Sequence, residues 1–414
     1  MSFSLLILTQ YFPPEVGAPQ NRLFELAIRL KQKGAKVQVL TAMPNYPKME
    51  VFKEYSGKKY CVEELEGIKV YRTYIYVSKQ KGIIKRLLNY FSFVISSAWY
   101  GPSKIDKADF ILCESPPLFL GYSAMYLTRK MKAKLIFNVS DLWPESAEKL
   151  GVVSNRQMLN LAYRLEGKLY KKSVLVTGQT QGICKDINKR YKDVKTYWLP
   201  NGVDLNYYNP DVIQDSGFRI KHNIANDTFL ILYAGIIGLA QGLDVILQAA
   251  LSMKDKNVVF VLLGNGPEKP RLMEMAQTEG LSNVIFIDSV SKKEMPSVLK
   301  ASDASVIPLR KLELFKGAIP SKIFECLAMK LPIILGVDGE ARELFIEKGK
   351  CGLYFEPENH IELCAQINLL LNDVELCRSL GENGRKYVNE NFNRDKIAEG
   401  LFNEIKKIQT EKDF

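Results

Sequence analysis

Short runs of apolar residues alternate with helical patterns along the chain. Residues 3–8 form an apolar run of strand type, and Tyr11-Phe-Pro-Pro14 then marks a turn. Residues 22–33 place apolar side chains at spacings of three and four, which predicts an amphipathic helix that ends near Gly34. Residues 37–40 predict the next strand. A strand–helix–strand unit of this kind requires a right-handed crossover, so the pattern predicts a parallel sheet.

The same pattern recurs in two groups, which are separated by the turn-rich stretch Leu199-Pro-Asn-Gly-Val-Asp204. The further predicted strands are 110–113, 135–139 and 174–178 before this stretch, and 229–233, 258–263, 284–287, 304–308 and 333–335 after it. A length of 414 residues favours two domains. We therefore predict an α/β protein with two doubly wound, Rossmann-like domains and a ligand at the carboxyl ends of their sheets.

The stretch 317–334, GAIPSKIFECLAMKLPII, predicts a helix followed by a buried strand. Pro320 and Ser321 are typical of a helix start, and we expect Ser321 to cap free backbone N–H groups. Lys322 and Glu325 are three residues apart, so they are neighbours on the polar side of this helix. This arrangement suits an anionic group beside a hydroxyl-rich group, such as the diphosphate and ribose of a sugar nucleotide. The alternative is an ordinary solvated ion pair.

Composition narrows the classes of function. Hydrophobic residues make up 47% of the chain and charged residues 25%, which is typical of a soluble globular protein. The seven cysteines are scattered without a CxxC motif, which predicts reduced side chains. Only His222 and His360 are present and no Asp-x-Asp pair occurs, so we expect no metal site. No predicted strand is followed by G-x-G-x-x-G, which argues against a dehydrogenase.

The net charge of +11 is unevenly distributed. Residues 1–198 hold 32 Lys+Arg and 16 Asp+Glu, a net charge of +16, and the remainder of the chain has a net charge of −5. Within the basic part, residues 83–100 are apolar and aromatic, with Lys79, Lys81 and Lys104 on either side. Lys85, Arg86 and Asn89 interrupt the segment, so no apolar run in it reaches the roughly 18–20 residues of a membrane span. It predicts either an interfacial amphipathic helix or a core-facing helix of the first domain.

Several motifs, in order along nearly the whole chain, resemble the family 4 glycosyltransferases, which have the GT-B fold of two Rossmann-like domains facing across a cleft. These motifs are Tyr11-Phe-Pro-Pro14 with Gly17, Pro200-Asn-Gly-Val-Asp204, Tyr233-Ala-Gly235, Leu263-Gly-Asn-Gly-Pro-Glu268, Pro320–Ala328 and Gly384-Arg-Lys-Tyr-Val388. Asp141-Leu-Trp-Pro-Glu-Ser-Ala147 and Ala240-Gln-Gly-Leu243 look closest to the bacterial branch that includes N-acetyl-L-fucosamine transferases of O-antigen and capsule assembly.

The resemblance implies how the chain is divided. Residues 1–198 correspond to the acceptor domain, and residues 199–385 correspond to the domain that binds the nucleotide sugar. Residues 386–414 correspond to a helical tail that packs back on the first domain.

The resemblance also implies a donor site in the second domain. Glu325 matches the family's glutamate that binds the ribose hydroxyls, and a carboxylate suits this role because it accepts two hydrogen bonds. The family's other glutamate falls on Gly317, so the backbone N–H groups of Gly317 and Ala318 are the candidate substitute. The family's phosphate-binding Arg and Lys fall on Ile236 and Gln241, and we expect Lys322 to supply the lost charge.

Glycines and one loop residue complete the expected donor contacts. Gly266 lies in a loop that resembles the one over the nucleotide base, where glycine lets the backbone approach closely. Val290 is the candidate for a backbone contact to the base, and Gly235 for a further contact to the nucleotide sugar. We expect the backbone of Gly17 to approach the diphosphate. The alternative for these glycines is a set of plain turns.

On the acceptor side, many relatives carry a histidine where this chain has Ser140. Asp141 is therefore the candidate for acid–base or electrostatic work at the acceptor hydroxyl, and Glu145 is a second candidate. The alternative for Asp141 is a helix cap before Leu142. Retaining transfer in this fold does not require a protein nucleophile, so we name none.

Together these features predict a metal-independent, retaining glycosyltransferase with no cofactor, which uses a UDP-sugar or another nucleotide sugar as donor. The expected partners are a lipid-linked sugar acceptor and an anionic membrane surface, with no nucleic acid. The expected location is the cytoplasm, at the inner face of the cell membrane. Two alternatives stay open: a sugar-nucleotide 2-epimerase of the same fold and a non-catalytic subunit that binds sugar nucleotides.

Overall fold

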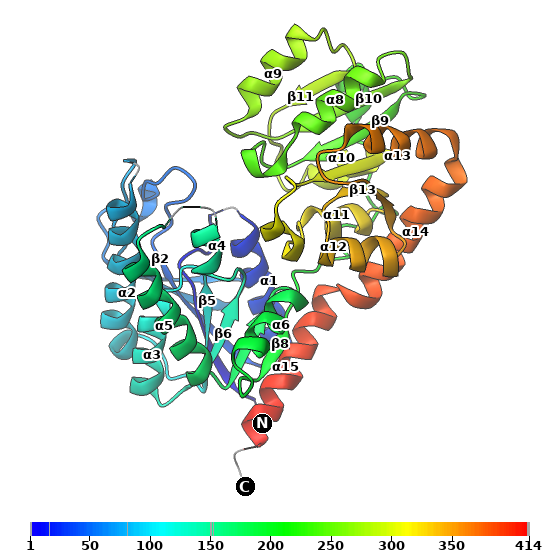
Figure 1. The fold of residues 1–414 in the computed structure, drawn as a ribbon. Helices are drawn as coiled ribbons and strands as arrows, with labels where there is room; N and C mark the ends of the chain where they lie inside the picture. The colour runs from blue at the N-terminus through cyan, green and yellow to red at the C-terminus, as the bar shows by residue number, and fades with distance from the viewer. Residues whose placement is uncertain (1, 16, 81, 150, 152, 412–414) are drawn as a thin grey trace. The chain divides into compact units, whose positions relative to one another are not determined.

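The computed structural model describes residues 2–15, 17–80, 82–149, 151 and 153–411. The chain forms two compact units, each with one β-sheet and covering helices (Figure 1). Unit 1 comprises Met1–Asn201 and Arg394–Phe414, and unit 2 comprises Gly202–Asn393. The first crossing falls inside the turn-rich stretch that the sequence marks. The chain returns to unit 1 at Arg394 and not at 386, because helix α14 (Val374–Asn391) runs on within unit 2.

Unit 1 is built on an eight-stranded sheet with the order β3-β4-β2-β1-β5-β6-β7-β8. Its strands are β1 (Ser4–Leu8), β2 (Lys36–Ala42), β3 (Tyr60–Leu65), β4 (Ile68–Thr73), β5 (Phe110–Ser115), β6 (Lys134–Val139), β7 (Leu175–Gly178) and β8 (Thr196–Trp198). All neighbours are parallel except the hairpin of β3 and β4. The sequence analysis missed this hairpin and β8. Edge strand β3 alternates exposed and partly buried residues, edge strand β8 has only three residues, and Lys69 and Arg72 interrupt β4, so none of them forms a continuous apolar run.

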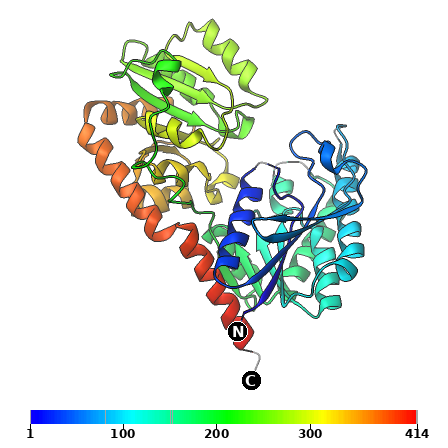
Figure 2. The same ribbon diagram turned by 180° about the vertical axis from the view of Figure 1, so that it is seen from behind.

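Helices cover both faces of this sheet. They are α1 (Ala18–Gln32), η1 (Lys53–Tyr55), α2 (Ile83–Lys104), α3 (Leu120–Met131), α4 (Glu145–Lys149), α5 (Arg156–Lys172), α6 (Gln181–Arg190) and α15 (Arg394–Thr410). Successive side chains of a strand point to opposite faces, so Leu6 and Leu8 pack with α2, α3 and α5, while Leu5 and Ile7 pack with α1 and α15. Figure 2 shows α1 and α15 side by side on their face of the sheet.

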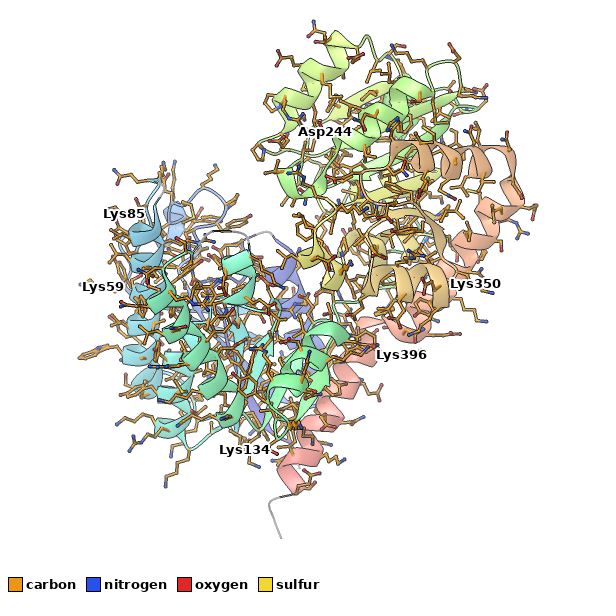
Figure 3. The ribbon with its side chains drawn as sticks, in the orientation of Figure 1. Lys59, Lys85, Lys134, Asp244, Lys350 and Lys396 are labelled. Carbon is orange, nitrogen blue, oxygen red and sulfur yellow. The ribbon has the colours of Figure 1, made fainter. Side chains whose placement is uncertain are left out.

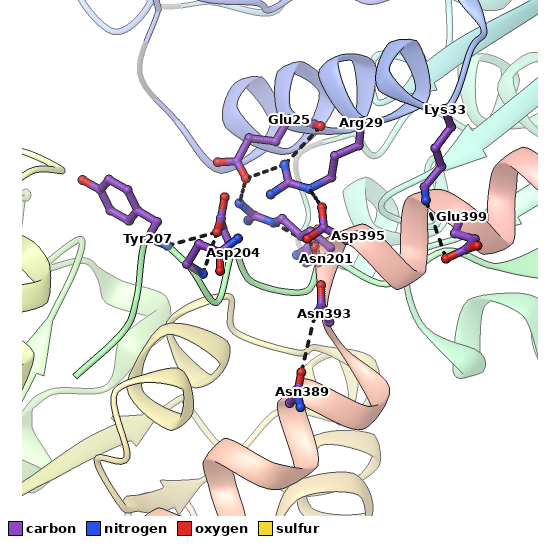
Figure 4. Close-up of polar contacts among 12 residues, drawn as sticks. Glu25, Arg29, Lys33, Asn201, Asp204, Tyr207, Asn389, Asn393, Asp395 and Glu399 are labelled. Carbon is purple, nitrogen blue, oxygen red and sulfur yellow. Dashed lines mark hydrogen bonds and ion pairs between the residues drawn. The ribbon is translucent and has the colours of Figure 1, made fainter. Parts of the chain in front are cut away.

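Polar contacts fasten α15 to α1 within unit 1 (Figure 4). Arg29 Nε donates to Asp395 Oδ1 at 2.7 Å, and Arg394 pairs with Glu25. Lys33 Nζ lies 3.6 Å from Glu399 Oε2. Apolar residues of α15 are buried in the same core as those of α1, so this helix is an integral part of unit 1.

Unit 2 is built on a six-stranded, fully parallel sheet with the order β11-β10-β9-β12-β13-β14. Its strands are β9 (Phe229–Ala234), β10 (Val258–Leu263), β11 (Val284–Ile287), β12 (Ala304–Pro308), β13 (Ile333–Gly336) and β14 (Gly352–Tyr354). Its helices are α7 (Phe218–Lys221), η2 (Leu239–Gln241), α8 (Asp244–Ser252), α9 (Lys269–Thr278), α10 (Met295–Ala301), η3 (Glu313–Gly317), α11 (Lys322–Ala328), α12 (Glu340–Arg342), η4 (Glu343–Lys348), α13 (His360–Asn372) and α14. Every strand predicted for this part of the sequence is present, and β14 was missed.

The apolar, aromatic segment of the basic half is helix α2, and it is both core-facing and exposed. On one side Asn89, Phe93 and Ser97 are buried. On the other side a stripe of large apolar residues is exposed, namely Ile84, Leu88, Phe91, Ile95 and Trp99. The buried side confirms the core-facing interpretation, and the interfacial interpretation of the exposed side stays a prediction.

Candidate functional site

Helix α11 of unit 2 begins at Lys322, as the sequence predicts. Ile323, Phe324 and Leu327 are buried, which confirms the predicted core face. The expected cap by Ser321 is wrong. Its side chain makes no capping hydrogen bond, because the residue already has the backbone angles of a right-handed helix (φ −60°, ψ −26°) and not the extended angles of a cap.

Lys322 extends over the end of strand β9. Its Nζ lies 3.9 Å from the centre of the Tyr233 ring. A Cβ placed on Gly235, whose φ is +146°, would lie 2.8 Å from the same nitrogen. Tyr233 is fully buried and its hydroxyl donates to the carbonyl of Ile236 at 2.6 Å. The ammonium therefore lies on an aromatic face, in space that is open because Gly235 has no side chain.

The environment of Lys322 is unusual for a lysine. Burial lowers its pKa to about 8, and the nearby Glu325 opposes this shift only in part. Among the residues that the structure describes, no oxygen accepts a hydrogen bond from its ammonium and no carboxylate forms an ion pair with it. A partly buried cation with unused donors is suited to bind an anion.

The loops that follow β9 and β10 are interlocked. A Cβ on Gly264 would lie 1.8 Å from the carbonyl oxygen of Gly235, and one on Gly266 would lie 2.1 Å from that of Ile237. Ile237 N donates to Asn265 O at 3.0 Å, and Glu268 N donates to Ile237 O at 3.1 Å. Glycine is therefore required here by the close approach of two backbones, whatever ligand the loop binds.

Lys269 joins this loop to the end of strand β11. Its Nζ donates to the carbonyl of Gly264 at 3.0 Å, to Asn265 Oδ1 at 3.1 Å and to the carbonyl of Ile287 at 3.3 Å. It also pairs with Asp288 Oδ1 at 2.6 Å. One ammonium thus ties the glycine loop to the residues just before Val290.

The structure brings together only part of the expected donor site. Glu325 lies one turn after Lys322, close enough to influence its pKa. Gly317 ends η3, is exposed, and a Cβ there would meet no atom within 4 Å. No hydrogen bond or ring contact within the described part of the chain joins Gly317 or Val290 to Lys322. Ile236 is 63% exposed, so its apolar side chain is presented to solvent.

In unit 1, Asp141 follows strand β6 and lines a cavity of about 340 Å³. Its Oδ2 accepts a hydrogen bond of 2.8 Å from Ser146 Oγ of α4. The carboxylate therefore contacts this helix through a side-chain hydroxyl group. Glu145 forms an ion pair of 2.6 Å with Lys149 and is not part of the cavity wall.

Gly17 precedes α1 in an extended conformation with φ 178°. A Cβ there would meet the flexible Gln20 side chain, so the position does not demand glycine.

A buried polar network next to Asp141 was not predicted. Arg22 Nη2 donates to Glu114 Oε1 at 2.6 Å and to Ser140 Oγ at 2.8 Å, and Asn138 donates to the other Glu114 oxygen. The side chains of Arg22 and Glu114 are 7% and 4% exposed. The available signal was Glu114 itself, an acidic residue at the end of an apolar strand. Ser140, where the sequence resemblance leads us to expect a histidine, is thus hydrogen-bonded to both members of this ion pair.

Tyr233 and Lys269 were also missed as site residues. Tyr233 belongs to one of the quoted motifs, but only its glycine drew attention. Lys269 has no sequence signal beyond its place after the glycine loop. Within the described residues no group of three or more His, Cys, Asp or Glu side chains is placed to hold a metal ion, and none of the seven cysteines forms a disulfide bond.

Comparison with known proteins gives matches to glycosyltransferases. Residues 215–387 match the family model described as "Glycosyl transferases group 1". The "Putative colanic acid biosynthesis glycosyl transferase WcaI" of Escherichia coli (strain K12) is 26% identical over 414 residues, which cover 97% of this chain and 99% of the relative. The "O-antigen chain mannosyltransferase C" of Escherichia coli is 26% identical over 217 residues, 52% of this chain and 55% of the relative.

Solved structures share the fold over the whole chain. Sucrose-phosphate synthase from Thermosynechococcus elongatus aligns with a TM-score of 0.77 at 16% identity, over 99% of this chain and 100% of its own. Anabaena Alr3699/HepE, solved in complex with UDP and glucose, aligns with a TM-score of 0.72 at 18% identity, over 98% and 99%. The fold is therefore GT-B, with two Rossmann-like units. Together with the sequence matches, this supports a group 1 glycosyltransferase.

Proposed function

We propose that the protein is a retaining glycosyltransferase of bacterial surface polysaccharide synthesis. It moves a hexosyl or N-acetylhexosaminyl group from a nucleotide sugar to a lipid-linked glycan. The names of the colanic acid and O-antigen relatives support the pathway class, and structural neighbours solved with UDP or UDP-glucose support the donor class. The motifs around Asp141 and Ala240 favour the branch that includes N-acetyl-L-fucosamine transferases.

The observation that carries this proposal is the environment of the Lys322 ammonium group. Its ammonium lies over Tyr233 beside Gly235, and no acceptor or carboxylate of the described residues uses it. The diphosphate of a nucleotide sugar supplies the missing anion, and Gly235 leaves room for the ammonium that binds it. Lys322 thereby takes over the charge that Ile236 and Gln241 do not provide. Glu325 binds the ribose hydroxyls, and the loop with Gly266 lies at the base together with Val290.

In the transfer, the bond between the donor's anomeric carbon and the diphosphate oxygen breaks, and the electron pair leaves with the nucleoside diphosphate. The oxygen of an acceptor hydroxyl forms the new bond to the same carbon. Asp141 of unit 1 is the candidate to accept the hydroxyl proton or to stabilise the developing positive charge. The reaction needs no metal ion or cofactor.

The exposed stripe of α2 supports a membrane-bound acceptor. No helix of the described chain is long and apolar enough to cross a membrane. The stripe lies on one face of the helix, and Lys79, Arg86 and Lys104 are exposed around it. Lys85 extends from the N-terminal part of α2 (Figure 3). An apolar stripe flanked by basic residues is the pattern of a helix that lies in the interface of an anionic membrane. We therefore propose that the protein binds the cytoplasmic face of the cell membrane. Lys81, a further basic residue of this region in the sequence, lies outside the described residues.

The test is incubation of the purified full chain with candidate nucleotide sugars, with and without an extract of lipid-linked oligosaccharides, in the presence of EDTA. We expect release of nucleoside diphosphate and glycosylated lipid only when both substrates are present. Conversion of the donor alone would indicate the 2-epimerase, and binding without turnover would indicate the non-catalytic subunit. A strict requirement for Mg²⁺ or Mn²⁺ would overturn the metal-independent chemistry.

A further inference from the structure

The cavity beside Asp141 lies entirely within unit 1. It is bounded by the N-terminal part of α2, the turn before α3, the connection from β6 to α4, and α5. Its volume of about 340 Å³ is within the range of small-molecule sites, which are mostly apolar with a few placed polar groups.

The aromatic wall of the cavity is preorganised. The rings of Phe119 and Trp143 meet edge to face with their centres 5.3 Å apart. Phe119 also packs on Phe91 of α2 at 5.0 Å, which fixes it from the other side. Aromatic faces of this kind suit the C–H face of a sugar ring.

Another part of the wall is aliphatic. Leu87, Val153, Met158, Leu159 and Ala162 line it, and none of these side chains offers a hydrogen-bond partner. A hydroxyl group placed against this wall would lose its hydrogen bonds to water without replacement, whereas a methyl group, including the terminal methyl group of an acetamido substituent, has none to lose.

Polar side chains also line the cavity, namely those of Tyr11, Arg86, Tyr90, Asp141 and Ser146. Asp141 Oδ2 accepts from Ser146 Oγ, while no donor among the described residues bonds Oδ1. Arg86 donates from Nε to the Tyr90 hydroxyl at 2.9 Å. If a hydrocarbon chain filled the cavity, the Oδ1 atom of Asp141 would be buried without a hydrogen-bond partner. A sugar hydroxyl group, in contrast, can donate a hydrogen bond to this oxygen. The carboxylate therefore favours a sugar over the isoprenoid part of a lipid.

We infer that this cavity binds a pyranose with an apolar methyl group, which is either the terminal methyl group of an acetamido substituent or the methyl group of a 6-deoxy sugar. The ring lies against Trp143 and Phe119, a hydroxyl group donates to Asp141, and the apolar substituent faces Met158 and Leu159. The inference rests on the proposed function, in which unit 1 receives the acceptor. It adds the chemical class of the acceptor residue, which neither the fold nor the relatives assign.

The experiment measures binding of simple glycosides to the full chain without any donor. The probes are methyl glucoside against its 2-acetamido-2-deoxy analogue, and methyl galactoside against methyl fucoside, its 6-deoxy analogue. Affinity is followed by ligand-observed NMR and by the fluorescence of Trp143, with a Trp143→Phe variant to assign the signal among the three tryptophans. We expect at least one of the substituted glycosides to bind about tenfold more tightly than its parent, which is the scale of discrimination that an apolar pocket achieves.

Two variants separate the roles of the walls. Met158→Gln places a polar group on the aliphatic wall and should abolish the preference while the parent glycosides still bind. Asp141→Asn should weaken all the glycosides. The matched control is Met273→Gln, at an exposed methionine of unit 2, which should change neither.

Equal affinities for parent and substituted glycosides would overturn the inference, and so would a preference that survives Met158→Gln. Binding of farnesyl phosphate with no binding of any glycoside would assign the cavity to the lipid instead. Because no donor is present, these outcomes do not depend on turnover. The preference without transfer would refute the proposed function alone, and transfer without the preference would refute the inference alone.

Discussion

The ammonium of Lys322 lies 3.9 Å from the centre of the Tyr233 ring, and the two residues come from different structural elements, the start of α11 and the end of β9. The ring supplies partial compensation for a charge that burial destabilises, but it supplies no hydrogen-bond acceptor. The pair is therefore a cation held ready for an anion, and this relationship motivates the first two predictions.

Replacing Lys322 should weaken diphosphate binding selectively. In the Lys322→Met variant, the affinity for a nucleoside diphosphate should fall about 10- to 100-fold, which corresponds to the loss of charge-assisted hydrogen bonds worth about 1.5–3 kcal/mol. The affinity for the nucleoside should change little. Calorimetry on both ligands checks this, with Lys256→Met, at an exposed lysine of unit 2, as control. Equal losses for both ligands would show that Lys322 does not contact the diphosphate.

Nucleotide binding should depend on pH because burial lowers the pKa of Lys322 to about 8. Below pH 8 the Lys322 side chain is already protonated, so its titration should not change the affinity for the nucleotide there. Above pH 8 the free protein must take up a proton to bind the anion, and affinity should fall towards tenfold per pH unit. In buffers of different ionisation enthalpy, calorimetry should show about 0.9 proton taken up per nucleotide at pH 9. Lys322→Met should remove the uptake, and a wild-type protein with no uptake at pH 9 would contradict the assignment.

The same shift has a defined effect on stability. The unfolded chain holds the Lys322 proton up to a higher pH than the folded chain does, so unfolding takes up a proton between about pH 8 and the lysine model value of 10.5. The contribution of this group to the free energy of unfolding therefore rises across that window. Below about pH 8 the free-energy cost of burying the charged ammonium is fully present. In that pH range Lys322→Met should therefore not lower the free energy of unfolding.

Glu325→Ala should impair donor binding without unfolding unit 2. If the carboxylate accepts hydrogen bonds from the ribose hydroxyls, its loss should raise the donor KM by about 10- to 100-fold. The thermal midpoint should stay within a few degrees of the wild type, because the residue is only partly buried. Glu279→Ala, at the exposed end of α9, serves as the matched control. Full activity of the Glu325 variant would refute this placement of the ribose.

Lys269 should act as a positioning residue for the base. Lys269→Met removes the ammonium that connects Gly264 and Asn265 to Ile287 and Asp288. We expect a higher donor KM and weaker discrimination between uridine and other nucleosides, with a smaller change in kcat. Competition assays with several nucleoside diphosphates measure this, and Lys293→Met, at an exposed lysine, controls for charge. If kcat falls while nucleoside discrimination is retained, the loop does not bind the base.

Unit 1 should attach the protein to anionic membranes through α2. Vesicles containing anionic lipid should bind the full chain at low salt, because each basic residue near the surface contributes about 1 kcal/mol and the apolar stripe adds insertion. Salt should weaken binding, since the Debye length is about 8–10 Å at physiological ionic strength. Trp99 is 77% exposed, so its fluorescence should shift to the blue on binding.

Substituting Lys79, Lys85, Arg86 and Lys104 with Gln should reduce vesicle binding more than the same change at four exposed lysines of α5, α6 and the loop after it, namely Lys168, Lys172, Lys189 and Lys192. Equal effects of the two sets would indicate that net charge and not the α2 surface drives binding. No binding at low salt would refute the membrane assignment.

The sequence by itself determined the two α/β units and the positions of their buried strands. Buried parallel strands carry apolar side chains on both faces, so they leave continuous apolar runs that are visible without a structure. It also determined the start of α11 and its core face, because helical periodicity is local. It did not determine β3, β8 or β14, whose partly exposed positions depend on the neighbouring strand.

Only the tertiary structure decided which residues meet. Tyr233 and Lys322 are 89 positions apart in the sequence, and their contact exists because β9 ends and α11 begins at the same edge of one sheet. In the same way, the chain positions of Glu114, Ser140 and Arg22 do not show that they form one buried network. The sequence specified which side chains are present and which face each one occupies. Whether an ammonium finds a carboxylate, an aromatic ring or no acceptor follows only from how the elements pack.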